Sequence, residues 1–205
     1  MLSAVIKTPL KTPNMVVEAE KIELRRRLQR LRAQMSGEQA AASSLQASRH
    51  ILACDAYRKA KCIMGFLAFG KELSVDIVLE QALADGKKVA VPLITSDKEF
   101  VPVRLLDMQH FALDRYGIRT APQPVQLVKH ETIDLILVPG VAFGRDGSRL
   151  GMGAGYYDRF LLKAGQAMRM GVAYDALMQD ALPVDAYDVG MQLLVSESGI
   201  AHLPV

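Results

Sequence analysis

Residues 133–162, IDLILVPGVAFGRDGSRLGMGAGYYDRFLL, decide the fold of this 205-residue chain. The stretch begins with an apolar run at 133–138, interrupted only by Asp134, which is typical of a central parallel strand buried on both faces. A glycine-rich loop follows, and the next residues predict a helix over about 155–164. Strand, loop and helix in this order indicate an α/β protein that binds its ligand beyond the end of the strand.

The segments around this stretch alternate in the same way. We predict helices over residues 17–35, 36–52 and 75–85, and further strands over residues 62–69, 89–93, 170–174 and 193–196. A strand, a helix and a strand joined by short connections form a βαβ unit, in which right-handed crossover makes the strands parallel. Residues 96–129 contain prolines and one candidate edge strand at 100–104, so we expect them to form an irregular flank of the sheet.

Local signals set the ends and the faces of the predicted helices. Ser36, followed three residues later by Gln39, matches a capping box, and Ser74 offers an N-cap to the helix at 75–85. In the first helix, apolar residues recur every three or four positions and predict the face that packs on the core. This apolar stripe consists of Leu24, Leu28, Leu31 and Met35.

Composition limits the class of protein. Half of the residues are apolar and the formal net charge is +3, so the chain can bury one substantial core and lacks a nucleic-acid-like charge. We predict a single domain over residues 17–205 after an N-terminal extension at residues 1–16. Cys54 and Cys62 have neither metal-ligand spacing nor the frequency of a disulfide scaffold, which favours a reducing, cytoplasmic compartment. No apolar run reaches the length of a membrane span.

The glycine-rich loop is a candidate anion site. Its backbone N–H groups, the helix N-terminus behind it and nearby guanidinium groups are the means by which proteins hold phosphate. A Walker A loop is excluded because Gly155 is followed by Tyr156 and Tyr157 rather than by Lys and Ser or Thr. A dinucleotide fingerprint is disfavoured because the loop lies late in the chain and follows Pro139 and Gly140.

Charged and aromatic residues beside the loop extend this hypothesis. Arg149 can fork onto phosphate oxygens, and Asp158, about one turn into the helix, can hold Mg²⁺ against them. An Asp in the first turn also suits the helix dipole without any metal, so both interpretations stay open for Asp158. Tyr156 and Tyr157 can stack on a flat ring or can pack in the core.

The motif PGVAF…DGSRLGMGAGYYDRF resembles the signature of the 5-formyltetrahydrofolate cyclo-ligases, also called 5,10-methenyltetrahydrofolate synthetases. The family's N-terminal Lys-x-x-x-Arg is matched by Lys21 and Arg25, and its glutamate after the first buried strand by Glu72. Its C-terminal Leu-Pro-Val followed by an aspartate is matched by residues 182–184 and Asp188. The resemblance covers about residues 21–196 in the right order and implies a three-layer α/β/α fold, shared with sugar-phosphate isomerases and CoA transferases.

The resemblance also implies a role for each matched residue. The catalytic residues would be Arg149 and Lys21. The residues that bind ATP would be Lys21, Arg25, Arg149, Leu150, Gly151, Met152, Gly153, Ala154, Gly155, Tyr156 and Tyr157. The residues that bind the folate would be Leu67, Glu72, Met152, Gly153, Ala154, Gly155 and Tyr156. The ligands of Mg²⁺ would be Asp158 and Asp188.

Plain structural interpretations stand beside three of these roles. Lys21 and Arg25 lie one turn apart and share a helix face, which a solvated basic surface would also explain and which we expect for Arg26 and Arg30. Leu67, in a predicted strand, would also suit the core.

The implied reaction is the ATP- and Mg²⁺-dependent cyclisation of 5-formyltetrahydrofolate to 5,10-methenyltetrahydrofolate. The implied partners are small-molecule substrates, the reduced folate and ATP, and neither a nucleic acid nor a membrane. We expect a monomer or a weak homo-oligomer. A folate- or nucleotide-binding relative that has lost catalysis is an alternative. An RNA-contacting arm at residues 18–32 is disfavoured, because acidic residues alternate with the basic ones.

The chain departs from the family's usual pattern at three places. Gly144 stands where family members usually carry Asp, and Met152 and Ala154 replace a usual aromatic or basic residue and a glycine. Residues 119–122 replace a glutamate-proline pair that usually follows Tyr-Gly-Ile. Because Ala disfavours positive φ, Ala154 predicts a re-shaped loop. We expect these changes to alter substrate affinity rather than reaction type.

Overall fold

The computed structural model describes residues 15–203, whose strands include a seven-stranded sheet in the order β12-β11-β9-β6-β1-β2-β3. Strands β11, β9, β6, β1 and β2 run parallel, and β12 and β3 close the two edges in the antiparallel sense. The predicted α/β class with a mostly parallel sheet is confirmed. The strands of this sheet are β1 (Cys62–Met64), β2 (Lys88–Ile94), β3 (Phe100–Leu105), β6 (Leu135–Pro139), β9 (Met168–Val172), β11 (Leu193–Ser196) and β12 (Gly199–His202).

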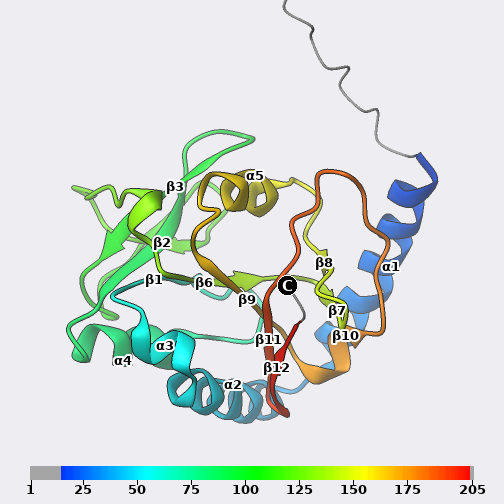
Figure 1. Cartoon of the computed structure of the whole chain (residues 1–205), viewed down its shortest axis with the longest axis horizontal. Coiled ribbons are helices and arrows are strands. Elements are labelled where there is room, and N and C mark those ends of the chain that lie inside the picture. Colours follow the sequence, from blue (N-terminus) through cyan, green and yellow to red (C-terminus); the bar gives the residue numbers. More distant parts are fainter. Residues whose placement is uncertain (1–14, 204–205) are drawn as a thin grey trace, which may run out of the picture.

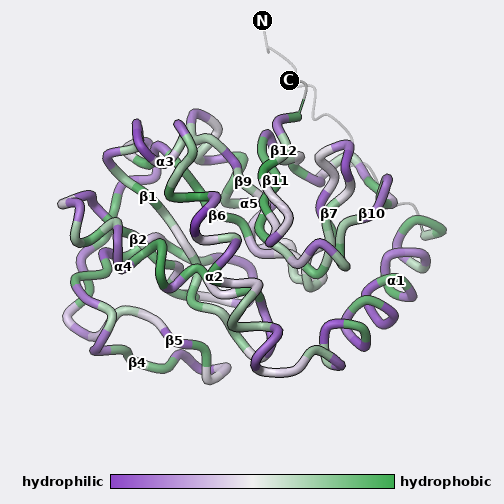
Figure 2. Tube along the Cα trace, turned by 90° about the horizontal axis from the view of Figure 1, so that it is seen from below, coloured by the Kyte–Doolittle hydropathy of each residue, from purple (hydrophilic) through white to green (hydrophobic). Residues whose placement is uncertain are grey.

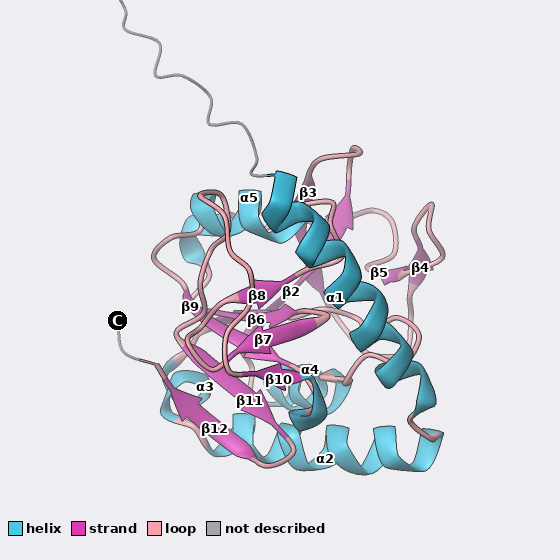
Figure 3. Ribbon diagram, turned by 90° about the vertical axis from the view of Figure 1, so that its right-hand side faces the viewer, coloured by secondary structure: helices cyan, strands magenta, loops and turns pink. Residues whose placement is uncertain are grey.

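Helices cover both faces of the sheet and give the molecule three layers. In Figure 1, α2, α3 and α4 lie on one face and α5 lies on the other. Figure 3 shows α1 running across one side of the molecule, beside the short strands β7, β8 and β10. The helices are α1 (Met15–Gln34), α2 (Gly37–Ala53), α3 (Asp55–Lys59), α4 (Asp76–Ala84) and α5 (Tyr156–Lys163), with 3₁₀ turns η1 (His130–Thr132) and η2 (Asp175–Leu177).

Two small sheets stand outside the main one. The first has the order β10-β7-β8, with β10 (Met178–Gln179), β7 (Ala142–Gly144) and β8 (Arg149–Leu150). The second pairs β4 (Ala112–Leu113) with β5 (Arg119–Thr120). The β7–β8 hairpin lies inside the stretch that the sequence predicts as one continuous loop, so that prediction was wrong. The hairpin delivers Arg149 directly to the start of the glycine loop.

The core is centred on β6, as the apolar run at 133–138 predicts. Leu135, Ile136, Leu137 and Val138 are fully buried, with side chains on both faces of the sheet. Figure 2 shows hydrophobic residues along the central strands, whereas α1 alternates between hydrophilic and hydrophobic segments. Burying each such aliphatic side chain contributes about 1.5–3 kcal/mol to stability.

The first helix differs from its prediction in its start and in its buried face. It begins at Met15, so two residues assigned to the extension at 1–16 belong to α1, and residues 1–14 lie outside the described residues. Leu28 is buried as expected, but Leu31 is 40% exposed. The inner face carries Lys21, which is 3% exposed. The buried face of α1 therefore includes a charged residue. The prediction that Leu31 packs on the core, which rested on the apolar stripe alone, was wrong.

Two further boundaries differ from the prediction. Strand β1 ends at Met64 rather than at residue 69, although Gly65 N still donates to Ala90 O of β2 at 2.9 Å. A Cβ at Gly65 would lie 2.5 Å from Leu79 Cδ2, so the chain passes close to α4 there. The N-cap of α4 is Val75, and the hydroxyl of Ser74 instead accepts a hydrogen bond from Asp76 N at 3.1 Å.

Of the remaining local features, one agrees with the sequence prediction and two short elements were not predicted. The capping box of Ser36 and Gln39 at the start of α2 is confirmed. The sequence prediction omits α3 and the edge strand β12, both short elements. Among the helices within residues 15–203, none combines the length and the apolar character needed to cross a membrane.

Candidate active site

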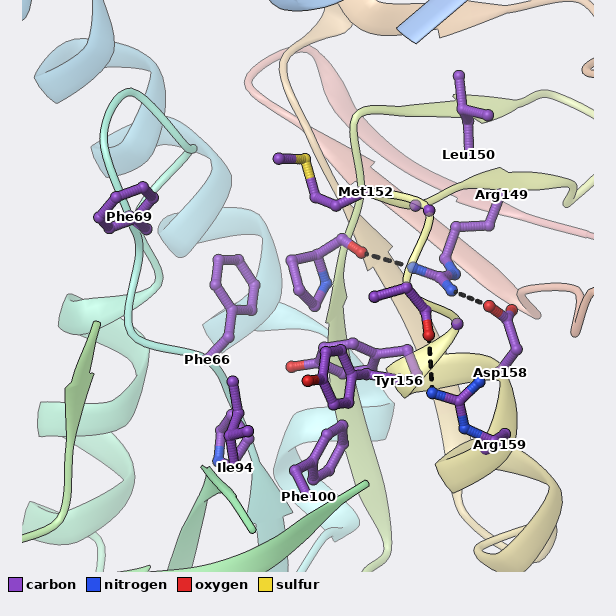
Figure 4. Close-up of a pocket in the computed structure, with 18 of the residues that line it drawn as sticks. Phe66, Phe69, Ile94, Phe100, Arg149, Leu150, Met152, Tyr156, Asp158 and Arg159 are labelled. Carbon is purple, nitrogen blue, oxygen red and sulfur yellow. Dashed lines mark hydrogen bonds and ion pairs between the residues drawn. The ribbon is translucent and has the colours of Figure 1, made fainter. Parts of the chain in front are cut away.

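One cavity of about 880 Å³ brings together all the residues predicted to be catalytic, to bind a substrate or to hold Mg²⁺. Its walls come from α1, the segment after β1, residues 92–119, the glycine loop with α5, and the segment 185–188. The predicted residues that line it are Lys21, Arg25, Leu67, Glu72, Arg149, Leu150, Gly151, Met152, Gly153, Ala154, Gly155, Tyr156, Tyr157, Asp158 and Asp188. Leu150 is 1% exposed, and Figure 4 shows its side chain pointing away from the guanidinium of Arg149.

The glycine loop, residues 151–155, has the conformation that its sequence favours. Gly153 and Gly155 adopt φ of 101° and 65°, which glycine tolerates without cost. A Cβ at Gly151 would lie 2.9 Å from Nη1 of Arg149, so the absence of a side chain there makes room for the guanidinium. Gly155 is the N-cap of α5 and places the helix N-terminus at the cavity.

The amides of this loop are free to bind a ligand. Within residues 15–203, the N–H groups of residues 151–155 donate to no backbone or side-chain acceptor. Five successive unpaired N–H groups beside a helix N-terminus form a site for a polyanion such as a nucleotide phosphate chain. The geometry therefore supports the anion site that the sequence predicts.

Arg149 is built into the base of this site. The residue is 6% exposed, and its Nη2 donates to Asp158 Oδ2 at 2.8 Å while Nη1 donates to Pro139 O at 3.2 Å. Figure 4 shows the first of these contacts as an ion pair under the glycine loop. Nε is buried and has no partner among the described residues. Because a buried donor without an acceptor is costly, Arg149 retains capacity to bind a ligand.

Lys21 forms a second ion-pair cluster in the lining of the cavity. Its Nζ lies 2.5 Å from Asp188 Oδ2 and 3.2 Å from Asp185 Oδ2. Burial lowers the pKa of Lys21, but hydrogen bonds and charges from the two aspartates outweigh this effect and raise it. The amine is therefore positively charged at neutral pH. Asp185 is not among the residues predicted from the sequence. Its position three residues before Asp188 is a signal that could have identified it, because the two residues share a turn. In this turn, Asp185 N donates to Asp188 Oδ2 at 2.8 Å.

The two predicted magnesium ligands lie close together but are paired with cations. Asp158 Oδ1 accepts from Val189 N at 3.4 Å, next to Asp188 in the chain. Within residues 15–203, no group of three or more His, Cys, Asp or Glu side chains is arranged to hold a metal ion. Mg²⁺ with a nucleotide needs only one or two protein carboxylates, since phosphates and water supply its other ligands. Carboxylate oxygens fit that requirement, and the role of both aspartates stays a prediction.

Glu72 lines the cavity from the segment that follows β1. Its Oε2 accepts from Phe69 N at 3.1 Å, and Oε1 lies 3.6 Å from Nη1 of Arg32. Burial is the largest influence and raises the pKa of Glu72 above its ordinary value. A desolvated carboxylate that keeps free lone pairs is suited to accept hydrogen bonds from a ligand's N–H groups.

Apolar side chains that sequence reasoning missed complete this wall. In Figure 4, Phe66 and Phe69 lie on the opposite side of the cavity from Met152, and Ile94, Phe100 and Tyr156 lie below them in this view. Phe66 and Phe69 immediately follow β1, and Ile94 and Phe100 end and begin the strands of the β2–β3 hairpin. Such a slot suits a flat heterocycle, because aromatic and aliphatic faces exclude water around it.

Polar groups from residues 96–129 also line the cavity. Asp97, Asp114, Tyr116 and Arg119 take part in the lining. Arg119 Nη2 lies 2.9 Å from Asp76 Oδ2, so the first residue of the divergent 119–122 segment anchors that segment to α4.

The comparison with known proteins agrees with this geometry. The model of the 5-formyltetrahydrofolate cyclo-ligase family matches residues 17–197. The chain belongs to this family. It is similar to the 5-formyltetrahydrofolate cyclo-ligase of Mus musculus, with 30% identity over 185 residues that cover 84% of this chain and 91% of the mouse protein. Identity to the Escherichia coli K12 cyclo-ligase is 28% over 177 residues, which cover 84% and 97% of the two chains.

Comparison with a solved structure supports the same fold. The NMR structure of Aquifex aeolicus 5,10-methenyltetrahydrofolate synthetase superposes with a TM-score of 0.81 at 29% identity, covering 90% of this chain and 93% of that one. The resemblance drawn from the glycine-loop motif and the fold that it implies are thereby confirmed.

Two departures from the usual cyclo-ligase pattern have structural explanations. Ala154 requires no left-handed conformation, because every residue with positive φ in residues 15–203 is a glycine. The loop turns at Gly153 and Gly155, on either side of Ala154, where φ is positive. Ala154 therefore does not require the change in loop shape that we predicted for an alanine at this position. At Gly144, a Cβ would lie too close to Asp146 Oδ1 and Ser148 Oγ.

The space beside Gly144 is filled by the next acidic residue in the hairpin. Asp146 Oδ1 accepts from Ser148 N at 3.0 Å and from Ser148 Oγ at 2.5 Å. Ser148 Oγ in turn accepts from Leu182 N at 3.2 Å. The carboxylate beside Ser148 therefore belongs to Asp146, whereas position 144, where family members usually carry Asp, is a glycine.

Proposed function

We propose that this chain catalyses the ATP- and Mg²⁺-dependent cyclisation of 5-formyltetrahydrofolate to 5,10-methenyltetrahydrofolate, with release of ADP and phosphate. One observation supports this most: five unpaired amides at residues 151–155 share one cavity with Arg149, Lys21 and Glu72. Family membership supplies the chemistry that such a cavity would perform.

The reaction explains why the cavity is rich in cations and poor in nucleophiles. The N5-formyl group is an amide whose oxygen must leave when N10 closes onto its carbon, and oxide cannot leave at neutral pH. Phosphorylation of that oxygen by ATP converts it into phosphate, a good leaving group. Phosphoryl transfer is accelerated mainly by positioning and by neutralising charge, so no side-chain nucleophile is needed.

The residues of the glycine-loop wall would hold the nucleotide. The amides of residues 151–155 and the N-terminus of α5 would bind its phosphates, with Lys21 and Arg25 adding charge from α1. Arg149 would neutralise charge on the γ-phosphoryl group as it passes to the formyl oxygen. N10 then attacks the formyl carbon, phosphate leaves with the former formyl oxygen, and N10 loses its proton.

Asp158 and Asp188 would hold Mg²⁺, which supplies charge neutralisation to the phosphates when it is bound. Each aspartate would then exchange an ion pair with Arg149 or Lys21 for a metal contact. The same exchange would free both cations for the phosphate oxygens.

The opposite wall would hold the folate. Glu72 would accept hydrogen bonds from the pterin, and Leu67, which is 4% exposed and lines the cavity, would pack on its ring. Tyr156 and residues 152–155, with the side chains of Met152 and Ala154, would cover the pterin from the nucleotide side.

The test mixes purified protein with 5-formyltetrahydrofolate, ATP and Mg²⁺. The expected result is the ultraviolet absorption of the methenyl product together with one equivalent of ADP. Absence of both products would reject the proposal. Tight folate binding without ATP consumption would instead favour a binding protein that has lost catalysis.

A further inference from the structure

Arg159, in the second turn of α5, connects two segments of the cavity wall. Its Nη2 donates to Ala154 O in the glycine loop at 2.7 Å, and its Nε donates to Lys98 O in the β2–β3 turn at 2.6 Å. Figure 4 shows the guanidinium beneath the loop, with the first of these hydrogen bonds drawn. The side chain therefore connects the glycine loop to the β2–β3 turn through one carbonyl group of each.

The contact with Ala154 fixes the direction of a loop amide. In a planar trans peptide, the C=O of one residue and the N–H of the next point to opposite sides. Holding Ala154 O on the side of Arg159 therefore directs the N–H of Gly155 the other way. Arg25 acts similarly at the far end of the loop, where its Nε donates to Gly151 O at 2.9 Å and so orients the amide of Met152.

The contact with Lys98 belongs to a larger attachment between α5 and the β2–β3 turn. Tyr156 Oη donates to Ser96 O at 3.0 Å, and Lys163 Nζ lies 2.9 Å from Glu99 Oε1. Among these side chains, Arg159 is the one that also holds the glycine loop. The turn carries Asp97 and leads into Phe100, both of which line the cavity.

We propose that Arg159 is a positioning residue that presents the glycine-loop amides to the nucleotide phosphates and keeps this loop in register with the β2–β3 turn. The inference rests on the proposed nucleotide role of the loop. Arginine suits this task because its planar fork carries several donors in fixed directions, whereas the ammonium of lysine is a flexible point charge.

The experiment compares Arg159→Ala and Arg159→Lys with the control Lys163→Ala. The control removes the neighbouring ion pair to Glu99 and leaves the glycine loop untouched. Affinity for a fluorescent ADP analogue in the presence of Mg²⁺ is measured for each protein, and KM values for ATP and for the folate accompany it. The chain has no tryptophan to interfere with the fluorescence.

The expected result is about a tenfold or greater loss of nucleotide affinity in Arg159→Ala, since a hydrogen bond from a charged donor contributes roughly that factor. The KM for ATP should rise more than the KM for the folate or the fall in kcat. Arg159→Lys should recover only part of the affinity, and Lys163→Ala should match the wild type. Thermal melting curves confirm that each variant is folded.

Three results would overturn the inference. Unchanged nucleotide affinity in Arg159→Ala, or an equal loss in Lys163→Ala, would remove the specific role of Arg159. Full recovery in Arg159→Lys would mean that a point charge suffices and that the residue contacts phosphate directly. If Arg159→Ala does not fold, Arg159→Gln takes its place with the same expected loss, and wild-type affinity there overturns the inference. If the wild type itself binds no nucleotide, the proposed function fails first.

Discussion

The two walls of the cavity are built on different principles. The central part of the glycine-loop wall is one contiguous stretch, residues 149–158, to which α1 adds Lys21 and Arg25. Its contacts are charges and backbone amides, such as the ion pair between Arg149 and Asp158. The Glu72 wall is assembled from the segment after β1 and from the β2–β3 hairpin, and it consists largely of apolar side chains around one carboxyl group. A phosphate chain needs donors in a fixed local order, whereas a flat ring needs only an enclosed slot. The central part of the proposed phosphate site is therefore compact in the sequence, and the residues that would enclose a ring are dispersed.

The strongest test of this contrast is Arg149→Ala, which should disable the glycine-loop wall. We expect a loss of about 2 to 4 kcal/mol of transition-state stabilisation, as for a lost oxyanion donor. In kcat/KM this corresponds to roughly 30- to 1000-fold. Steady-state kinetics measure it, with Arg145→Ala as the control because Arg145 is an exposed arginine in the same hairpin. Unchanged turnover would remove Arg149 from the mechanism.

A smaller effect on the same wall is expected for Lys21→Met. The variant loses one charged contact to phosphate, so the KM for ATP should rise roughly 10- to 100-fold. The KM for the folate should change little, because Glu72 lies on the other wall. The exposed Arg26, on the same helix, provides the control Arg26→Met. Equal rises in both KM values would mean that the walls do not act separately.

Glu72→Gln should produce the reverse pattern. The KM for the folate should rise about tenfold, as for the loss of a charged hydrogen-bond partner, and the KM for ATP should stay near its wild-type value. Glu80→Gln, at an exposed position of α4, is the matched control. A rise in the KM for ATP alone would mean that Glu72 contacts the nucleotide rather than the folate.

The raised pKa of Glu72 also predicts a pH dependence of stability. Between its ordinary value of 4.5 and the raised value, the folded protein binds more protons than the unfolded chain, so stability falls as pH rises through this interval. Glu72→Gln should flatten that fall, and Glu80→Gln should not. Urea midpoints recorded from pH about 4 to about 7 would show the difference, and identical slopes in all three proteins would contradict the burial of this carboxyl group.

The smallest effect is expected outside both walls, at Gly144. Gly144→Asp restores the residue usual in the family but forces a side chain against Asp146 and Ser148, which should destabilise the fold by about 1–3 kcal/mol. Adding Asp146→Gly should recover part of this loss by vacating the space. Chemical denaturation measures both variants. If Gly144→Asp alone is as stable as the wild type, Asp146 does not occupy that corner.

The sequence predicts the glycine-loop wall better than it predicts the other. The loop, the helix after it and the capping box of Ser36 and Gln39 are local patterns, and all are present. The partners of distant residues are not local. Neither the 164-residue separation of Lys21 from Asp185 nor the pairing of Arg32 with Glu72 leaves a periodic signal.

The errors of prediction have the same origin. Leu31 fits an apolar stripe but lies outward, because the inner face of α1 carries charged residues that serve the cavity. The β7–β8 hairpin is held by long-range pairing with β10 and is hidden in a glycine-rich stretch that favours turns. Phe66 and Phe69 belong to a predicted strand, whereas β1 ends at Met64 and both residues line the cavity.

The central claim is that the amides of residues 151–155 bind the nucleotide phosphates. Backbone NMR of the ¹⁵N-labelled 22.5 kDa protein, titrated with ADP and Mg²⁺, tests it most directly. We expect the amide signals of Gly151, Gly153 and Gly155 to shift most, in a saturable manner that matches the nucleotide affinity. Saturable binding of ADP that leaves these three signals in place would contradict it.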